Sequence, residues 1–134
     1  MKRILWIVLG AALATAGCSD PVPPTTPTPI VPTVTTTFAD TLLVLGANTH
    51  SFSVSAVSGL TVNLTSLQPG AAVGLGVGTF GSTGCLIADQ IVTVPGTKAQ
   101  LSGTATVPGL FCVEVFDLGN LVEPVAYSIN VLHQ

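Results

Sequence analysis

The sequence predicts an all-β domain, an antiparallel β-sandwich of about eight short strands, over residues 38–134. Apolar residues alternate with polar or small residues along this stretch, which is the period of a strand with one buried face. No stretch shows the 3.6-residue apolar period of an amphipathic helix. Turn pairs separate the alternating runs: Ser58-Gly59, Pro69-Gly70, Pro95-Gly96, Pro108-Gly109 and Gly119-Asn120.

Five runs show the alternation most clearly, at 49–57, 60–67, 71–78, 111–115 and 125–131. Because successive side chains of a strand point to opposite faces, one set from each run is expected in the core. The expected core residues are His50, Phe52, Val54, Ala56, Leu60, Val62, Leu64, Ala71, Val73, Leu75, Val77, Phe111, Val113, Val115, Val125, Tyr127, Ile129 and Val131. With 97 residues from Phe38 onward, the stretch makes one domain by length.

The N-terminus predicts export and a lipid anchor. Lys2 and Arg3 precede the apolar run 4–14, which is too short to span a membrane but has the length of a signal-peptide core. Ala16-Gly17-Cys18 resembles the lipobox of bacterial lipoproteins, although Thr15 stands where that motif usually has Leu. We therefore expect a signal peptide at 1–17 and acylation of Cys18. An ordinary cleaved signal that leaves Cys18 incidental is the alternative.

The cysteine count also favours lipidation. The chain has three cysteines, and exported proteins tend to pair their thiols, so one cysteine is left over. If Cys18 carries lipid, Cys85 and Cys112 remain, and we expect a disulfide between them. Two buried free thiols are the alternative. A metal site is a weaker one, because two cysteines without nearby partner ligands do not complete a tetrahedron.

Residues 18–37 predict a disordered tether. Prolines and threonines dominate this segment, and proline both fixes φ and removes a hydrogen-bond donor. Such a chain samples polyproline II and reaches roughly 50 Å as a semi-rigid spacer. A proline-rich ligand for a partner domain is the alternative. By resemblance to lipoprotein sorting, Ser19 after the acylated cysteine favours the outer membrane.

The charge of the chain argues against nucleic acid as a partner. From Cys18 onward there is one basic side chain, Lys98, and there are six acidic ones, hence a formal net charge of −5. Nucleic-acid binding needs a basic patch, and this sequence offers none. Ser, Thr and Gly supply the polarity instead, which leaves a weakly charged surface prone to contact other surfaces.

Three stretches, Phe52 to Leu67, Gly109 to Asp117 and Tyr127 to Val131, resemble the bacterial pre-peptidase C-terminal domain. The resemblance covers most of residues 38–133 and consists mainly of strand patterning. It implies a small jelly-roll-like sandwich of the kind usually appended to secreted enzymes and tied to binding and secretion. No enzyme accompanies the module here, and the chain is more similar to stand-alone bacterial lipoproteins of that shape. No set of site residues is carried over.

Motifs for metals and cofactors are weak. Asp117, Asn120 and Glu123 could supply oxygen ligands to calcium, but Asp117, Gly119 and Asn120 are more typical of a turn before the last strand. Residues 76–81 have the spacing Gly-x-Gly-x-x-Gly without a following helical pattern, so we expect a bend or bulge there and no dinucleotide site. We expect no cofactor and no resident metal.

Catalytic and partner-binding residues are equally sparse. A serine nucleophile needs a nearby base, and the only histidines are His50, on an apolar face, and His133, expected to fray as the penultimate residue. Phe80 and Phe116 are the aromatic residues expected to be exposed, and they are candidates for a partner contact.

The sequence therefore favours a non-enzymatic, lipid-anchored β-sandwich of the bacterial envelope with a structural, adhesive or protein-interaction role. The membrane would be reached through lipid on Cys18, and an envelope protein or a glycan would be the partner. A ligand-binding or accessory module for a polysaccharide or a secreted enzyme is the alternative.

Overall fold

A computed structural model describes residues 25–134 except Thr97 and Ala99, so the expected signal peptide at 1–17 and Cys18 lie outside the described residues. The described part contains eight β-strands and no helix. The strands are β1 (Val34–Leu42), β2 (Ala47–Val54), β3 (Ser58–Gln68), β4 (Val73–Gly81), β5 (Gly84–Thr93), β6 (Leu101–Ala105), β7 (Gly109–Phe116) and β8 (Val125–His133). Accordingly, no helix of the described residues is long and apolar enough to cross a membrane.

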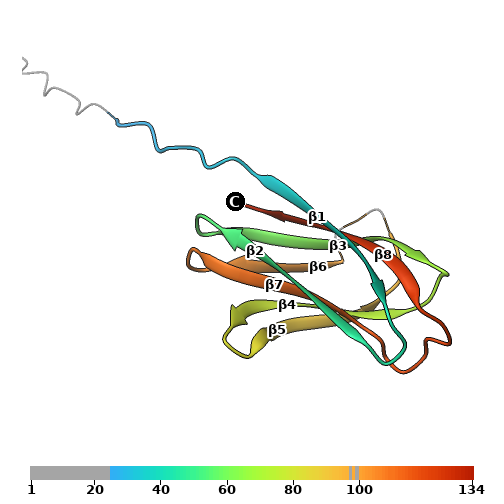
Figure 1. The fold of residues 1–134 in the computed structure, drawn as a ribbon. Helices are drawn as coiled ribbons and strands as arrows, with labels where there is room; N and C mark the ends of the chain where they lie inside the picture. The colour runs from blue at the N-terminus through green and yellow to red at the C-terminus, as the bar shows by residue number, and fades with distance from the viewer. Residues whose placement is uncertain (1–24, 97, 99) are drawn as a thin grey trace, which may run out of the picture.

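The strands form two four-stranded antiparallel sheets packed face to face, as predicted (Figure 1). One sheet has the order β1-β8-β3-β6 and the other the order β2-β7-β4-β5. The chain changes sheet at every connection except the one between β4 and β5, which pair as neighbours. This interleaved order is that of an eight-stranded jelly roll. It leaves β1, β6, β2 and β5 as edge strands.

The core lies between the sheets and is built from the alternating sets that the sequence predicts. Val62, Leu64, Leu75, Val113 and Ile129 are almost completely shielded from solvent. Ala71 and Ile91 pack against this core from its margin. Burial of a Val or Leu side chain stabilises the fold by roughly 1.5–3 kcal/mol, so the alternation accounts for the choice of faces.

Strand β1 begins at Val34, four residues before the domain start expected at Phe38. Val34–Leu42 pairs along its length with β8, and Thr37 Oγ1 bonds Asn130 Oδ1 at 2.9 Å. Threonine is β-branched and suits a strand, so the end of the expected Pro/Thr tether is recruited into the sheet. Residues 25–33 have no regular secondary structure and are almost wholly exposed. Figure 1 shows them running away from the sandwich.

The sandwich has two distinct ends. At the tether end, residues 25–33 join β1 and the C-terminus lies nearby, with Val34 paired to His133 (Figure 1). At the far end lie the β1–β2 turn (43–46), the β3–β4 loop (69–72) and the β7–β8 loop (117–124). Because β1 has nine residues at about 3.3 Å each, the two ends are separated by roughly 30 Å.

Candidate functional site

Asp117 organises the loops of the far end. Its Oδ1 accepts the backbone N–H groups of Gly119 at 2.9 Å, Asn120 at 3.1 Å and Leu121 at 3.2 Å. Its Oδ2 accepts the N–H of Leu45 at 2.7 Å, across 72 residues of sequence. The backbone N–H of Asp117 in turn donates to Gly46 at 2.9 Å. One carboxylate therefore builds its own turn and also holds the β1–β2 turn.

These hydrogen bonds change the pKa of the Asp117 carboxyl group. Desolvation by itself would raise the pKa of Asp117, but the four backbone N–H donors outweigh it and hold the pKa below the ordinary 3.8. Hydrogen bonds to the ionised form favour that form. The hydrogen bonds from the two loops therefore favour the ionised form of the Asp117 carboxylate.

Two of the three calcium candidates, Asp117 and Asn120, are engaged in loop hydrogen bonds. Both oxygens of Asp117 already accept backbone donors, and Asn120 Nδ2 donates to the Ala72 carbonyl at 3.1 Å. Glu123 is exposed on the same loop. The described residues contain no group of three His, Cys, Asp or Glu side chains able to hold a metal ion. The geometry here is that of a turn.

Apolar side chains project from the loops that Asp117 joins. We define the far-end cluster as Leu43, Leu45, Leu118 and Val122, all exposed, with Leu45 at 80% and Val122 at 93%. Leu45 has φ 57°, in the left-handed region that glycine or asparagine normally occupies. Asp117 and the Gly46–Leu43 bond at 2.9 Å hold it there. An exposed leucine is therefore held in an unfavourable backbone conformation.

Glycines along β4 let neighbouring groups lie directly on the strand. Gly74, Gly76 and Gly78 share the outer face of their sheet and are nevertheless buried. A Cβ at Gly74 would overlap the Phe116 ring, one at Gly76 would lie 2.8 Å from Ile87, and one at Gly78 would overlap the Leu86 carbonyl. The Gly-x-Gly-x-x-Gly spacing therefore serves packing, and it is followed by strand β5 rather than by a helix.

The expected disulfide joins Cys85 to Cys112, with the two Cα atoms 5.7 Å apart. Cys85 lies on β5 and Cys112 on β7, and β4 lies between these strands. Two features bring β5 and β7 within reach of one bridge. Gly78 admits the backbone of β5, and the register of β5 shifts between the pairs Val77–Asp89 and Gly78–Ile87, which leaves Ala88 as an extra residue. This bulge lies on β5, opposite the middle of β4, whereas the sequence predicts a bend or bulge at the end of the glycine-rich strand. At that end the chain turns at Ser82 and Thr83 into β5.

Phe80 and Phe116 lie at opposite ends of the same sheet. Phe80 pairs with Cys85 at the tether end and is 40% exposed, whereas Phe116 pairs with Gly74 at the far end. Phe116 is half-buried because its ring covers Gly74. The fold does not bring the two aromatic candidates into one patch.

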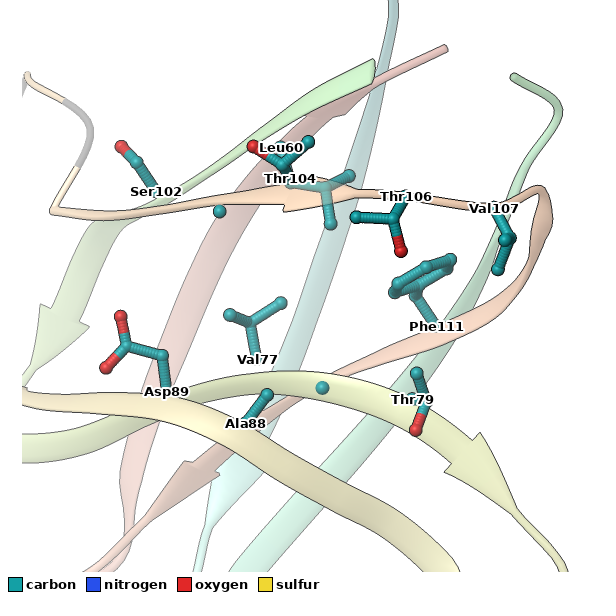
Figure 2. Close-up of a pocket in the computed structure, with 12 residues that line it drawn as sticks. Leu60, Val77, Thr79, Ala88, Asp89, Ser102, Thr104, Thr106, Val107 and Phe111 are labelled. Atoms are coloured by element: carbon teal, nitrogen blue, oxygen red, sulfur yellow. The ribbon is translucent and has the colours of Figure 1, made fainter. Parts of the chain in front are cut away.

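A cavity of about 270 Å³ opens between edge strands β5 and β6 (Figure 2). Leu60, Val77, Ala88 and Phe111 give it an apolar lining, and Asp89 and Thr106 contribute polar groups. Figure 2 shows Val77, Ala88 and Asp89 rising from one sheet toward β6. On β6, Gly103 pairs with the buried Leu60 and so faces inward without a side chain, and a Cβ built on it meets nothing within 4 Å. The missing side chain of Gly103 creates this space.

Both histidines have structural partners. Nε2 of His50 lies 2.6 Å from the Tyr127 hydroxyl, and the His50 ring stacks on Phe38 at 4.7 Å. Burial lowers the pKa of His50, although the Asp40 carboxylate opposes this, and burial raises the pKa of Tyr127.

The expectation that His133 frays is wrong. His133 is 6% exposed, its ring packs on Phe52 at 5.1 Å, and its Nε2 lies 2.9 Å from Thr36 Oγ1. The penultimate position is held because β8 pairs with β1 up to the contact of His133 with Val34.

No protein-family model matches the chain, and no curated protein sequence matches it either. The resemblance to the pre-peptidase C-terminal domain and the assignment as a lipoprotein therefore stay predictions. The far-end cluster and the cavity are the two candidate sites that sequence reasoning missed. Each depends on contacts between residues distant in the chain. The sequence signal for the far-end cluster was a set of apolar residues in turns, and the signal for the cavity was a glycine, Gly103, in an edge strand.

Proposed function

We propose that this chain is an exported, lipid-anchored β-sandwich of the bacterial envelope that offers its far end to a partner protein. Three features of the sequence support the anchor: the basic start at Lys2 and Arg3, the short apolar run, and Ala16-Gly17-Cys18. The Cys85–Cys112 disulfide supports an oxidising compartment. It also leaves Cys18 as the one cysteine of the sequence outside the bridge, available for lipid.

The observation that carries the proposal is the placement of the far-end cluster relative to the tether. Residues 25–33 enter at one end of β1, and Leu43 and Leu45 follow directly after the other end. Leu118 and Val122 lie on the loop that Asp117 bonds to this turn. Exposed apolar side chains that gather on adjoining loops are typical of a protein contact. An anchor at Cys18 would leave these side chains directed away from the membrane.

The proposed role is non-enzymatic. His50 is taken up by Tyr127 and Phe38, and His133 by Thr36 and Phe52, so both candidate bases serve packing. A general base must lie within hydrogen-bond reach of the group that it activates, and the Nε2 atoms of His50 and His133 lie instead against the hydroxyls of Tyr127 and Thr36.

Two experiments test the proposal. The first measures the intact mass of the protein extracted from bacterial membranes. We expect a chain that begins at Cys18 and carries the added mass of several acyl chains, and an unmodified Cys18 would contradict the anchor.

The second experiment places a photo-crosslinking residue at Val122 in the far-end cluster, or at Val57 in the β2–β3 turn at the tether end, in living cells. Val57 is a matched control because it is an exposed valine in a turn, at 62% exposure. We expect Val122 to capture a partner that Val57 does not, and Leu45→Ser to reduce that capture. Capture of the same proteins from both positions would contradict a contact at the far end.

A second candidate function is ligand binding, as in an accessory module. The observation that favours it is the cavity between β5 and β6, where an apolar lining meets few polar groups. Its volume suits a small molecule rather than a polysaccharide chain.

A further inference from the structure

The cavity between β5 and β6 has the composition of a small-ligand site. Leu60, Val77 and Phe111 are buried and form its apolar interior, and the single charged residue of the lining is Asp89 (Figure 2). None of the described residues that line it is a Lys, Arg or His. Ligand sites in proteins commonly combine apolar walls with a few placed polar groups. The one charge here selects for the opposite charge on the ligand.

The fold directs Asp89 into this space by a specific device. Asp89 pairs with Val77, whose side chain lies in the core, so the Asp89 side chain faces the same interior side of the sheet. The bulge at Ala88 sets this register, and bulges commonly re-aim side chains beside functional sites. Asp89 Oδ1 accepts the Gln90 N–H at 2.8 Å, whereas no bond occupies Oδ2 among the described residues.

We propose that this cavity binds a small organic cation, a ligand whose apolar body lies against Leu60, Val77 and Phe111 and whose ammonium or guanidinium group meets Asp89. Phe111 adds an aromatic ring to the lining, and aromatic faces attract cations. A free amine and a lysine side chain share this chemistry. Binding here goes beyond the protein contact at the far end, because the cavity lies along the β5–β6 side of the sandwich.

An inward-pointing charge and a bulge also protect an edge strand from pairing with another chain. Protection by itself does not require an empty apolar space behind the charge. Gly103, however, leaves that space open on the facing strand, although a side chain there would meet nothing within 4 Å. The open space is the observation that distinguishes a ligand site from a protected edge.

The test titrates isotope-labelled protein with n-butylammonium at neutral pH and follows the backbone amide signals by NMR. We expect saturable shifts at Asp89 and Gly103, and weaker binding of neutral n-butanol. Asp89→Asn should weaken butylammonium binding about two- to fivefold, because it removes the charge-assisted hydrogen bond of an exposed carboxylate. Asp40→Asn is the matched control, since Asp40 also lies on an edge strand and accepts the next N–H, at 2.7 Å.

A second variant tests the space itself. Gly103→Val should occupy part of the cavity and weaken butylammonium binding, while Gly59→Val should leave binding unchanged. Gly59 is the matched control because it lies on the neighbouring strand β3, and a Cβ there also meets nothing within 4 Å. Nα-acetyl-lysine amide in place of butylammonium distinguishes a protein side chain from a free amine as the better ligand.

Three results would overturn the proposal. The first is equal binding of butanol and butylammonium, which would make the cavity merely apolar. The second is absence of any saturable shift with butylammonium. The third is an Asp89→Asn protein that self-associates but binds butylammonium unchanged, which would assign Asp89 to edge protection.

Discussion

At the tether end of the sandwich a disulfide joins β5 to β7, whereas at the far end the Asp117 carboxylate joins two loops by hydrogen bonds. Both devices link segments distant in the sequence. The disulfide acts on strands whose backbones are already close because β4 carries glycines. The carboxylate acts on turns, where backbone N–H groups have no partner strand. The two ends therefore differ in what disrupts them: reductant at one, acid at the other.

The largest expected effect is at the tether end. Replacement of Cys85 and Cys112 by Ala should lower the free energy of unfolding by about 3–4 kcal/mol on the chain-entropy model, given a separation of 27 residues. Urea unfolding of the oxidised protein and of the double variant measures it. An unchanged urea midpoint would show that closing the loop between Cys85 and Cys112 does not stabilise the folded domain.

Gly78→Ala should cost about 2–3 kcal/mol, because a Cβ there overlaps the backbone carbonyl of Leu86 and β5 must move away. Gly59→Ala is the control, since its Cβ would meet nothing within 4 Å. Thermal unfolding of both variants provides the comparison. Equal stability of the two would contradict the close approach of β4 and β5.

The two aromatic candidates should respond differently to the same change. Phe116→Ser should cost about 1–2 kcal/mol, because it uncovers Gly74, and Phe80→Ser should cost at most about 0.5 kcal/mol. Urea unfolding separates the two cases. A larger loss for Phe80 would place that ring, rather than Phe116, among the packed residues.

Acid should loosen the loops of the far end, because these loops depend on the ionised Asp117 carboxylate. The pKa of Asp117 is lowered in the folded protein, so its stabilising contribution is present above the ordinary value of 3.8 and is lost as the pH falls through the folded value. Asp117→Asn should remove this acid-dependent part of the stability curve. Unfolding free energies measured between pH 2 and pH 6 give the curves, and parallel curves for the wild type and Asp117→Asn would contradict this role.

The smallest effect has the opposite sign. Leu45→Asn should stabilise the domain by up to about 1 kcal/mol, because asparagine tolerates the left-handed backbone better than leucine. The same change should weaken capture of a partner at Val122. A variant that is both less stable and unimpaired in capture would remove Leu45 from the proposed contact.

The strands that the sequence identified most clearly are mostly those inside the sheets. The alternating runs at 60–67, 71–78, 111–115 and 125–131 correspond to β3, β4, β7 and β8, which have a neighbour on both sides. Strands β1, β5 and β6 gave no clear alternation. All three are edge strands and bury only part of one face. Fewer of their positions therefore require an apolar side chain, and the alternation is weaker.

By itself, the sequence determined the all-β class, the buried faces, the Cys85–Cys112 pair and the turn at Asp117, because these depend on local periodicity, residue chemistry and counting. Only the tertiary structure decided the strand order, the contact of Asp117 with Leu45, the burial of His133 and the space beside Gly103. Each of these depends on which distant strands become neighbours. A period of two fixes the face of a side chain but not the strand that it meets.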